Sequence, residues 1–198
     1  MPRPKTHSPT SLTDSALAVF WTSGFFATSM DDLVRATGVS RHGIYGDFGG
    51  KRALFLACFQ RYQDLVVTPA FAAVERPGAG LTEIRGYFEF QIAAAEQSGL
   101  PGPGCFVANM ATEVAPHDTD VRDKVREHND RLKAGFASAV WNALSPSHSM
   151  DDAEISDVAQ SILVFATGLW SMSRIVSSAD DLRGAVASFM LSLERRLA

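Results

Sequence analysis

The chain has 198 residues, of which 46% are hydrophobic and 20% are charged, enough for one substantial core or a small domain joined to a larger one. No uninterrupted apolar run approaches the roughly 20 residues of a membrane-spanning helix, and the polar start MPRPKTHSPT has no apolar signal segment. The two cysteines, Cys58 and Cys105, lack metal-ligand spacing. We therefore expect a cytoplasmic protein with no membrane partner, cofactor or metal.

The charges are unevenly distributed along the chain. A net charge of −4 by itself argues against a nucleic-acid-binding protein. However, residues 1–62 carry seven Lys and Arg against four Asp, whereas residues 63–198 carry eleven bases and eighteen acids. A basic end on an acidic body suits a protein that contacts DNA with one end only.

The first sixty residues predict a small helical domain. Residues 1–10 are expected to form a loose arm, which either contacts DNA through its basic residues or has no role. A helix should then begin near Ser11 or Leu12 and end at Gly24. Phe25 and Phe26 are expected to close the small core beneath this helix.

Residues 28–51, TSMDDLVRATGVSRHGIYGDFGGK, predict two short helices joined by a tight turn. Ser29 can cap the first helix, and an acid three positions later partly satisfies a capping box. Gly38 follows, where the left-handed conformation that ends a helix favours Gly. Ser40 can then cap a helix over residues 41–48. This is how a helix-turn-helix places its second helix in the DNA major groove.

The second of these helices should present a DNA-reading face. Ile44 and Phe48 are expected to face the core, which leaves Arg41 and His42 outside as candidates for base contacts. Two glycines weaken the helix but allow the backbone to approach DNA closely. The expected DNA-contacting residues are Thr28, Ser40, Arg41, His42, Gly43, Tyr45, Gly46 and Lys51.

The same stretch resembles a known family. The residues that carry the resemblance are Gly24-Phe25, Thr28-Ser29-Met30, Gly38-Val39-Ser40, Ile44-Tyr45, Phe48 and Lys51. From about Leu12 to Tyr62 they are similar to the DNA-binding signature of the TetR/AcrR family of transcriptional repressors. The resemblance agrees with phosphate contacts from Thr28, Tyr45 and Lys51. Asp47 departs from the family pattern, and we expect its carboxylate to turn towards Arg52 or an exposed edge.

The helical periodicity of the remaining chain completes an all-α fold of about nine helices. A fourth helix should run from Gly50 or Lys51 through Leu65, with a kink or break at Thr68 before Pro69. Further helices are expected at about 81–98, 105–115, 121–144, 151–178 and 182–197. We place the DNA-binding domain at residues 1–50 and the ligand-binding and dimerisation domain at 51–198.

The last two predicted helices, the eighth and ninth, indicate an assembly. The helix from about Asp151 to Ser178 is apolar on more than one side and must therefore be buried on more than one side. A two-fold four-helix interface between two copies satisfies this requirement, and the resemblance implies the same homodimer. Burial inside a monomer core is the competing interpretation.

A small-molecule effector is expected within the second domain, as the resemblance implies. The candidate walls are Phe88, Phe106, Met110, Phe136, Phe165 and Trp170, and the candidate polar anchors are Asn109, Glu113 and His128. Ordinary core packing is the alternative for each apolar residue, and a surface or satisfied position is the alternative for Glu113 and His128. The ligand would be apolar or aromatic.

Cys105 has two interpretations. It follows a Gly-Pro-rich loop at a predicted helix start, where the helix dipole lowers a thiol pKa and would suit a redox or electrophile sensor. A small residue packed at the helix start is the alternative.

Together these features predict a ligand-responsive repressor that binds a palindromic DNA operator as a homodimer. The sequence contains no G-x-S-x-G, phosphate-loop or H-E-x-x-H motif, so we do not expect an enzyme. A thiol sensor acting through Cys105, or an activator in place of a repressor, remains the alternative.

Overall fold

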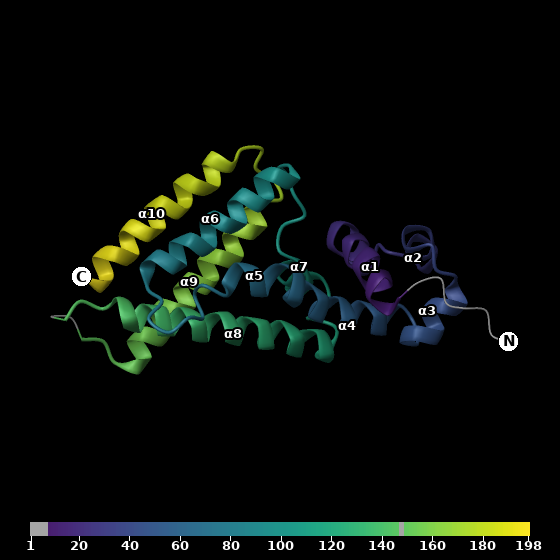
Figure 1. Ribbon diagram of the computed structural model, residues 1–198, viewed down its shortest axis with the longest axis horizontal. Coiled ribbons are helices and arrows are strands. Elements are labelled where there is room, and N and C mark those ends of the chain that lie inside the picture. Colours follow the sequence, from purple (N-terminus) through teal and green to yellow (C-terminus); the bar gives the residue numbers. More distant parts are fainter. Residues whose placement is uncertain (1–7, 147–148) are drawn as a thin grey trace.

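A computed structural model describes residues 8–146 and 149–198, and every regular element in these ranges is a helix (Figure 1). The helices are α1 (Pro9–Ser23), α2 (Met30–Thr37), α3 (Arg41–Phe48), α4 (Lys51–Tyr62), α5 (Thr68–Phe71), α6 (Leu81–Ser98), α7 (Phe106–Glu113), α8 (Thr119–Ala143), α9 (Asp152–Met172) and α10 (Ala179–Leu197), and a π-helix, η1 (Gln63–Val67), joins α4 to α5. The predicted all-α fold is confirmed. Most of the expected N-terminal arm, residues 1–7, lies outside the described residues.

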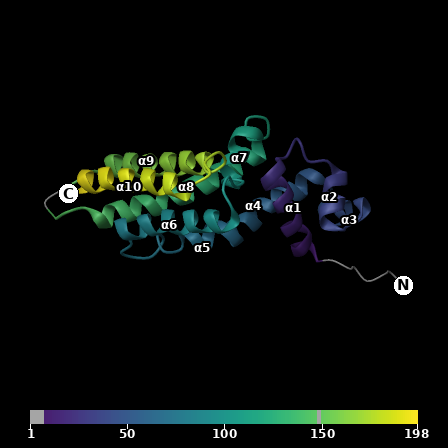
Figure 2. The same cartoon turned by 90° about the horizontal axis from the view of Figure 1, so that it is seen from above.

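The molecule is elongated, with α1, α2 and α3 at one end and a helical bundle of α6, α8, α9 and α10 at the other (Figures 1 and 2). The α4 helix runs between the two ends and packs against α1. In the bundle, α8 packs against α9 and α6 packs against α10. This is the predicted arrangement of a small helix-turn-helix domain on a larger helical domain.

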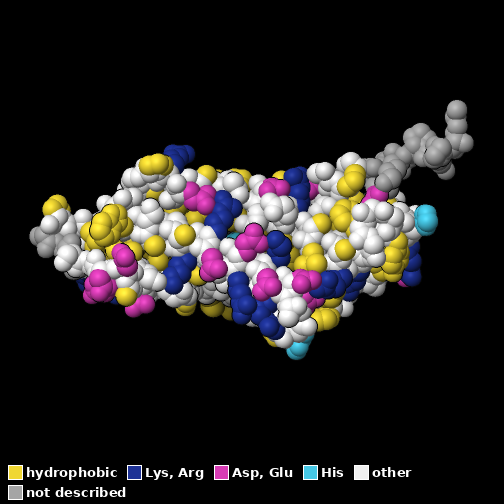
Figure 3. All heavy atoms as spheres, turned by 90° about the horizontal axis from the view of Figure 1, so that it is seen from below, with side chains coloured by type: hydrophobic (Ala, Val, Ile, Leu, Met, Phe, Trp, Pro, Cys, Tyr) yellow, Lys and Arg dark blue, Asp and Glu magenta, His cyan; other side chains and the backbone are white. Residues whose placement is uncertain are grey.

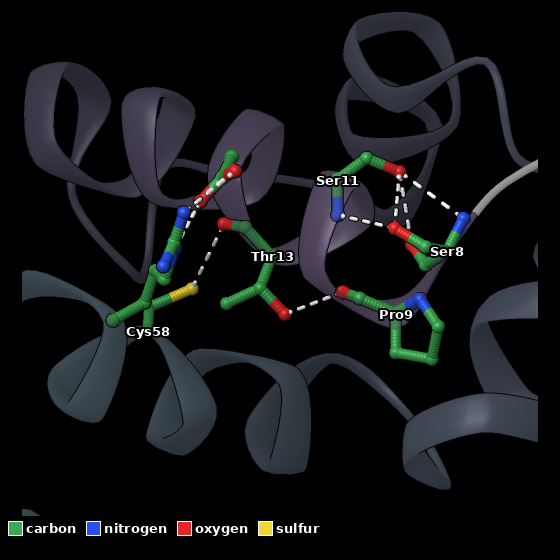
Figure 4. Close-up of polar contacts among 7 residues, drawn as sticks. Ser8, Pro9, Ser11, Thr13 and Cys58 are labelled. Atoms are coloured by element: carbon green, nitrogen blue, oxygen red, sulfur yellow. Dashed lines mark hydrogen bonds and ion pairs between the residues drawn. The ribbon is translucent and has the colours of Figure 1, made fainter. Parts of the chain in front are cut away.

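The first helix begins slightly earlier than the sequence indicated. Ser8 is its N-cap, because the Ser8 side chain accepts a hydrogen bond from the Ser11 backbone N–H at 3.0 Å (Figure 4). Pro9 stands at the first helical position, where its missing N–H costs nothing.

The caps of α2 and α3 are those that the sequence predicted. Ser29 and Asp32 form a reciprocal capping box: the Asp32 N–H donates to Ser29 Oγ at 3.1 Å, and the Ser29 N–H donates to Asp32 Oδ2 at 2.9 Å. Gly38 ends α2 in the left-handed conformation, with φ of 69°. Ser40 caps α3 by accepting a hydrogen bond from the Gly43 N–H at 3.2 Å. The turn therefore fixes the start of α3 on the end of α2.

The small core under these helices differs from the prediction at Phe26. Ile44 of α3 is fully buried, Phe48 is half-buried, and Phe25 packs on Phe55 with ring centroids 4.6 Å apart. Phe26, however, is 60% exposed. In the short loop after Gly24, only one of two consecutive aromatic side chains points inwards.

Of the predicted kink or break at Thr68, the break is absent, because the chain stays helical through Pro69, and the helix is irregular just before Thr68. The five residues of η1 adopt wider π turns, and the Thr68 N–H donates to the Gln63 carbonyl. Pro69 lacks an N–H and its ring would clash with the carbonyl four residues back, and a π turn relieves this conflict. The wider turn also shifts the helix face, so that Leu65, expected inside, is 48% exposed. Counted as one helix, α4, η1 and α5 bring the described total to the predicted nine.

The charged face of α8 and the apolar faces of α9 and α10 both reach the surface. Along α8, Lys124 pairs with Glu127 and Arg126 with Asp123, and Figure 3 shows Lys or Arg interspersed with Asp or Glu over this side of the molecule. The α9 helix ends at Met172, six residues before the predicted Ser178. Among the described helices, α9 alone has the length and apolar composition of a membrane span, although 44% of that stretch is buried inside the protein.

Replacement of Gly24 by Ala should lower the free energy of unfolding by about 1–3 kcal/mol. Gly24 has φ of 84° and ψ of 172°, a conformation nearly restricted to Gly, and an added Cβ would lie 2.6 Å from Glu113 Oε2. Urea denaturation followed by circular dichroism measures the change. Gly86→Ala in α6 is the matched control: a Cβ there meets nothing within 4 Å, and Ala should gain up to about 1 kcal/mol. Equal effects at the two positions would contradict this account of Gly24.

Candidate nucleic-acid interface and effector cavity

The α3 helix presents a polar surface at one end of the molecule. Arg41, His42 and Gly46 are exposed, and Tyr45 is 52% exposed, while Ile44 between them is buried. The N-cap Ser40 is exposed and Gly43 is half-buried. The structure therefore brings six of the eight predicted DNA-contacting residues together on α3 and its cap.

Arg41 is held by an acid that the sequence did not single out. Its Nη2 lies 2.7 Å from Oδ1 of Asp31 in the first turn of α2. The hydrogen bond that Arg41 donates to the Asp31 carboxylate, and then the charge of that carboxylate, raise the pKa of Arg41. Both side chains are mostly solvent-exposed, and such pairs contribute little to stability. Asp31 thus holds the Arg41 guanidinium beside α2, and a DNA base or phosphate can take the place of the Asp31 carboxylate.

The other two predicted DNA-contacting residues, Thr28 and Lys51, lie outside α3. Thr28 is buried, and its hydroxyl donates to the Gly24 carbonyl at 2.6 Å. In this conformation the hydroxyl is engaged within the protein, and its phosphate contact stays a prediction. The Lys51 ammonium lies 4.3 Å from the centroid of the Phe25 ring. Partial burial lowers the Lys51 pKa, and the nearby Glu113 carboxylate opposes that change.

Polar contacts at three places join α1, the loop after α1 and the first turn of α4 to later parts of the chain. The Trp21 Nε1–H donates to the Gly104 carbonyl at 2.9 Å. The Phe26 N–H donates to Glu113 Oε1 at 2.8 Å, so Glu113 faces the loop after α1.

The third contact is an ion-pair cluster at the start of α8. Arg52 binds both oxygens of Asp118, at 2.7 and 2.9 Å, and also Asp120 at 2.7 Å. These hydrogen bonds raise the pKa of Arg52 and lower that of Asp118. The clamp ties the first turn of α4 to the N-terminus of α8, where acids are favoured by the helix dipole.

Most of the predicted ligand walls are ordinary core residues. Phe88, Phe106, Met110 and Phe136 are fully or almost fully buried among other aromatic and aliphatic side chains. Phe165 stacks on Phe189, with ring centroids 4.0 Å apart. The Asn109 amide donates to the Pro103 carbonyl at 2.8 Å and so holds the loop before α7. Of the predicted set, only His128 and Trp170 line the cavities described next.

A cavity of about 380 Å³ lies where α1, the α4–η1–α5 run, α6, the loop 99–105 and α9 meet. Its walls include Trp21, Tyr62, Leu65, Val66, Pro69, Phe90, Gln91, Cys105, Trp170 and Ser173. A smaller cavity of about 50 Å³ shares Tyr62, Gln91, Cys105 and Trp170 with it and extends to His128. Sequence reasoning missed Trp21, because nothing along the chain connects the first helix with the loop at Gly104.

Cys105 has the opposite pKa change to the one expected of a helix N-terminus. It does cap α7: its Sγ accepts from the Ala108 N–H and from the Tyr62 hydroxyl, each at 3.5 Å. Burial nevertheless outweighs these hydrogen bonds and raises the thiol pKa. Cys58 is buried against the Thr13 carbonyl (Figure 4), and burial also raises its pKa.

His128 is a buried, satisfied histidine. Its Nδ1 lies 3.0 Å from the Gln63 Nε2 amide, which donates to it. Burial, and then the charge of Arg131, lower its pKa to about 4. In residues 8–146 and 149–198, no group of three or more His, Cys, Asp or Glu is placed to hold a metal ion.

Comparison with known proteins identifies the family. The model described as "Bacterial regulatory proteins, tetR family" matches residues 12–58, and that described as "Tetracyclin repressor-like, C-terminal domain" matches residues 80–189, which is more than half of the chain. The chain belongs to the TetR family. It is therefore a DNA-binding transcriptional regulator, as the helix-turn-helix and its exposed face indicated.

Individual TetR-family relatives agree with this assignment. The chain is 25% identical over 172 residues to the HTH-type regulator YezE of Bacillus subtilis, covering 86% of this chain and 88% of YezE. It is 29% identical to the HTH-type repressor ComR of Escherichia coli, covering 64% of this chain and 60% of ComR. Its fold matches that of CifR, solved with 26-bp operator DNA, at a TM-score of 0.81 and 16% identity over 96% of this chain and 99% of that one.

In this TetR-family chain, His128 should make stability depend on pH. Its folded pKa of about 4 lies below the ordinary 6.5, so the unfolded chain binds the proton first as pH falls. The contribution is complete above about pH 6.5 and is lost towards pH 4, with about 2 kcal/mol gone by about pH 5. Urea denaturation at about pH 7 and pH 5 measures it. His128→Gln should remove this part of the slope, whereas the exposed His117→Gln should not; equal slopes in all three proteins would refute the assignment.

Proposed function

We propose that this TetR-family regulator is a repressor that binds a palindromic operator as a homodimer and is released by a small apolar or aromatic effector. The observation that carries the proposal is α3: Arg41, His42 and Tyr45 project from a helix that buried Ile44 fixes to the core. Its place of action is the cytoplasm. Residues 1–50 form the DNA-binding domain and residues 51–198 the effector and dimer domain.

The proposed DNA contacts follow from side-chain chemistry. Arg41 donates two hydrogen bonds to guanine O6 and N7, and His42 donates to or accepts from a neighbouring base. The Tyr45 hydroxyl and Lys51 bind phosphates. Binding exchanges the Asp31 carboxylate for DNA at Arg41 and draws Lys51 from the Phe25 ring. ComR, a repressor by name, and the CifR–operator complex support this function through similarity.

The proposed dimer uses α9 and α10. Large apolar side chains remain exposed on both helices, among them Val164 and Met172 on α9 and Leu191 on α10. A two-fold axis beside these faces would bury them in a four-helix interface. Two α3 helices about 34–36 Å apart, or one further turn, would then meet successive major grooves.

A thiol or electrophile sensor acting through Cys105 is the second candidate. Cys105 lines both cavities next to Tyr62, which gives a reagent access to Sγ. The raised pKa of the thiol weighs against it, because the thiolate is the reactive form. Activation of transcription in place of repression would leave the DNA-contacting residues unchanged.

Selection of bound duplexes from a random DNA pool tests the proposed function directly. Wild-type protein should enrich a palindrome, and Arg41→Ala should weaken binding to it by about 1–3 kcal/mol while relaxing the preference at one base pair in each half-site. Arg126→Ala, which removes an exposed base on α8, is the matched control and should leave affinity unchanged. Enrichment of no sequence, or an unaltered preference in Arg41→Ala, would show that α3 does not read DNA.

Lys51→Ala should weaken binding to every DNA sequence alike. Loss of one phosphate contact should reduce the slope of log affinity against log salt by about one. Fluorescence anisotropy with the selected palindrome and with a scrambled duplex over a salt series provides the measurement. An effect confined to the palindrome would assign Lys51 to base recognition.

A further inference from the structure

We propose that the cavity between Trp21 and Trp170 binds a neutral aromatic ligand carrying one hydrogen-bond acceptor, and that this ligand controls DNA binding through Trp21. The inference rests on the proposed effector-released regulator and specifies the chemistry and location of its effector site. It also moves that site away from most of the aromatic residues that the sequence indicated.

The walls of the cavity contain no Asp, Glu, Lys, Arg or His. Its two titratable groups, Tyr62 and Cys105, are kept neutral because burial raises the pKa of each. An ionised ligand would lose its hydration here without gaining a counter-charge, at a cost that disfavours binding. The cavity therefore selects neutral molecules.

One buried donor in the wall lacks a well-formed hydrogen bond. Trp170 is 7% exposed, and no acceptor among the described residues meets the geometry of a hydrogen bond with its indole Nε1. The Tyr87 hydroxyl lies close enough for the Trp170 donor to offset part of the burial that raises the Tyr87 pKa to about 12, so a ligand acceptor would replace this weak contact. Two other donors in the wall are paired: Trp21 Nε1–H with the Gly104 carbonyl, and the Ser173 hydroxyl with the Trp170 carbonyl. Because indole is a donor only, Trp170 calls for an acceptor such as a carbonyl oxygen.

The size and lining of the cavity favour an aromatic ligand. Its volume of about 380 Å³ lies near the lower end of the roughly 300–1,000 Å³ typical of small-molecule sites. Trp21 and Tyr62 meet edge to face, with ring centroids 5.0 Å apart. Leu65 and Phe90 also line the cavity, and each is about half exposed. The apolar lining of the cavity therefore continues to the protein surface at these two residues, one on η1 and one on α6.

The same wall reaches the DNA-binding domain. Trp21 belongs to α1, which packs against α2 and α4, and it is hydrogen-bonded to the loop at Gly104. That loop is joined to the end of α9, because the Gly102 N–H donates to the Ser173 carbonyl at 3.0 Å. A Cβ on Gly104 would lie 2.9 Å from the Trp170 carbonyl, so the loop and α9 are in close contact. A ligand bound between Trp170 and Trp21 would therefore contact both α9 and α1, which this loop bridges by its hydrogen bonds.

Three naphthalenes of similar shape test the ligand chemistry: 2-acetylnaphthalene is neutral with one acceptor, 2-ethylnaphthalene lacks the acceptor, and 2-naphthoate is an anion. Calorimetry should show that wild-type protein binds the acetyl compound about ten-fold more tightly than the ethyl compound and does not bind the naphthoate. In Trp170→Phe, the acetyl preference should disappear while the ethyl compound still binds. Trp141→Phe, a change at an exposed tryptophan outside the cavity, is the control and should keep the preference.

The location is tested by two further measurements. In Trp141→Phe, the acetyl compound should quench the fluorescence of the two remaining tryptophans, Trp21 and Trp170, both in the wall. Ala95→Phe should fill the cavity and abolish binding of both neutral compounds while thermal unfolding remains cooperative. Binding that survives Ala95→Phe, an acetyl preference retained in Trp170→Phe, tight binding of the naphthoate, or no binding of either neutral compound would overturn the site.

Control through Trp21 is tested with the DNA selected from the random pool. The acetyl compound should weaken DNA binding by wild-type protein, and Trp21→Phe, which keeps the aromatic wall but loses the donor to Gly104, should bind the compound without this weakening. Equal weakening in both proteins, or none in wild type, would overturn the coupling. If wild-type protein selects no DNA, the proposed function itself fails, while the calorimetry still decides the ligand chemistry independently.

Discussion

The burial of Ile44 is the interaction on which the DNA-contacting surface depends. The eight residues of α3 include Gly43 and Gly46, which each cost about 1 kcal/mol relative to Ala, so the helix would be marginal in isolation. Ile44 has no exposed surface and lies in the same core as Phe20 and Phe55. Ser40 caps the start of α3 and Gly49 ends it. Between them, the burial of Ile44 fixes which face of α3 is exposed to solvent.

The basic charge of residues 1–62 is largely engaged within the protein. Four arginines in this range form ion pairs, Arg35 with Asp32, Arg41 with Asp31, Arg52 with Asp118 and Arg61 with Asp14, and Lys51 lies over the Phe25 ring. On DNA binding, phosphates and bases would therefore replace the carboxylates that pair with these arginines and the aromatic ring that lies under Lys51. Because the exposed pairs contribute little stability, such exchange is energetically accessible.

The small domain is joined to the bundle by contacts of three kinds. The Arg52 clamp is an ion-pair cluster, the Glu113 contact places a carboxylate on a backbone N–H, and Trp21 makes a neutral hydrogen bond to a loop carbonyl. The last of these contacts borders the cavity of about 380 Å³, since Trp21 and Gly104 both line it. The first two hold the domains together, whereas the third lies where a bound molecule can alter it. The proposed difference in role between the three contacts depends on which of them a ligand can reach.

The sequence by itself determined the helix-turn-helix, because its signals are local. Gly38, Ser29 and Ser40 act on backbone groups within a few residues, and the spacing of Ile44 decides which side of α3 is buried. The cavity beside Trp21, the partner of Arg41, the contact of Glu113 with Phe26 and the raised pKa of Cys105 were decided only by the tertiary structure. Apart from the Arg41–Asp31 pair, which joins residues ten apart, each depends on groups brought together from distant parts of the chain, as Trp21 and Gly104 are. Burial in that region reversed the effect that the helix N-terminus alone would have had on the pKa of Cys105.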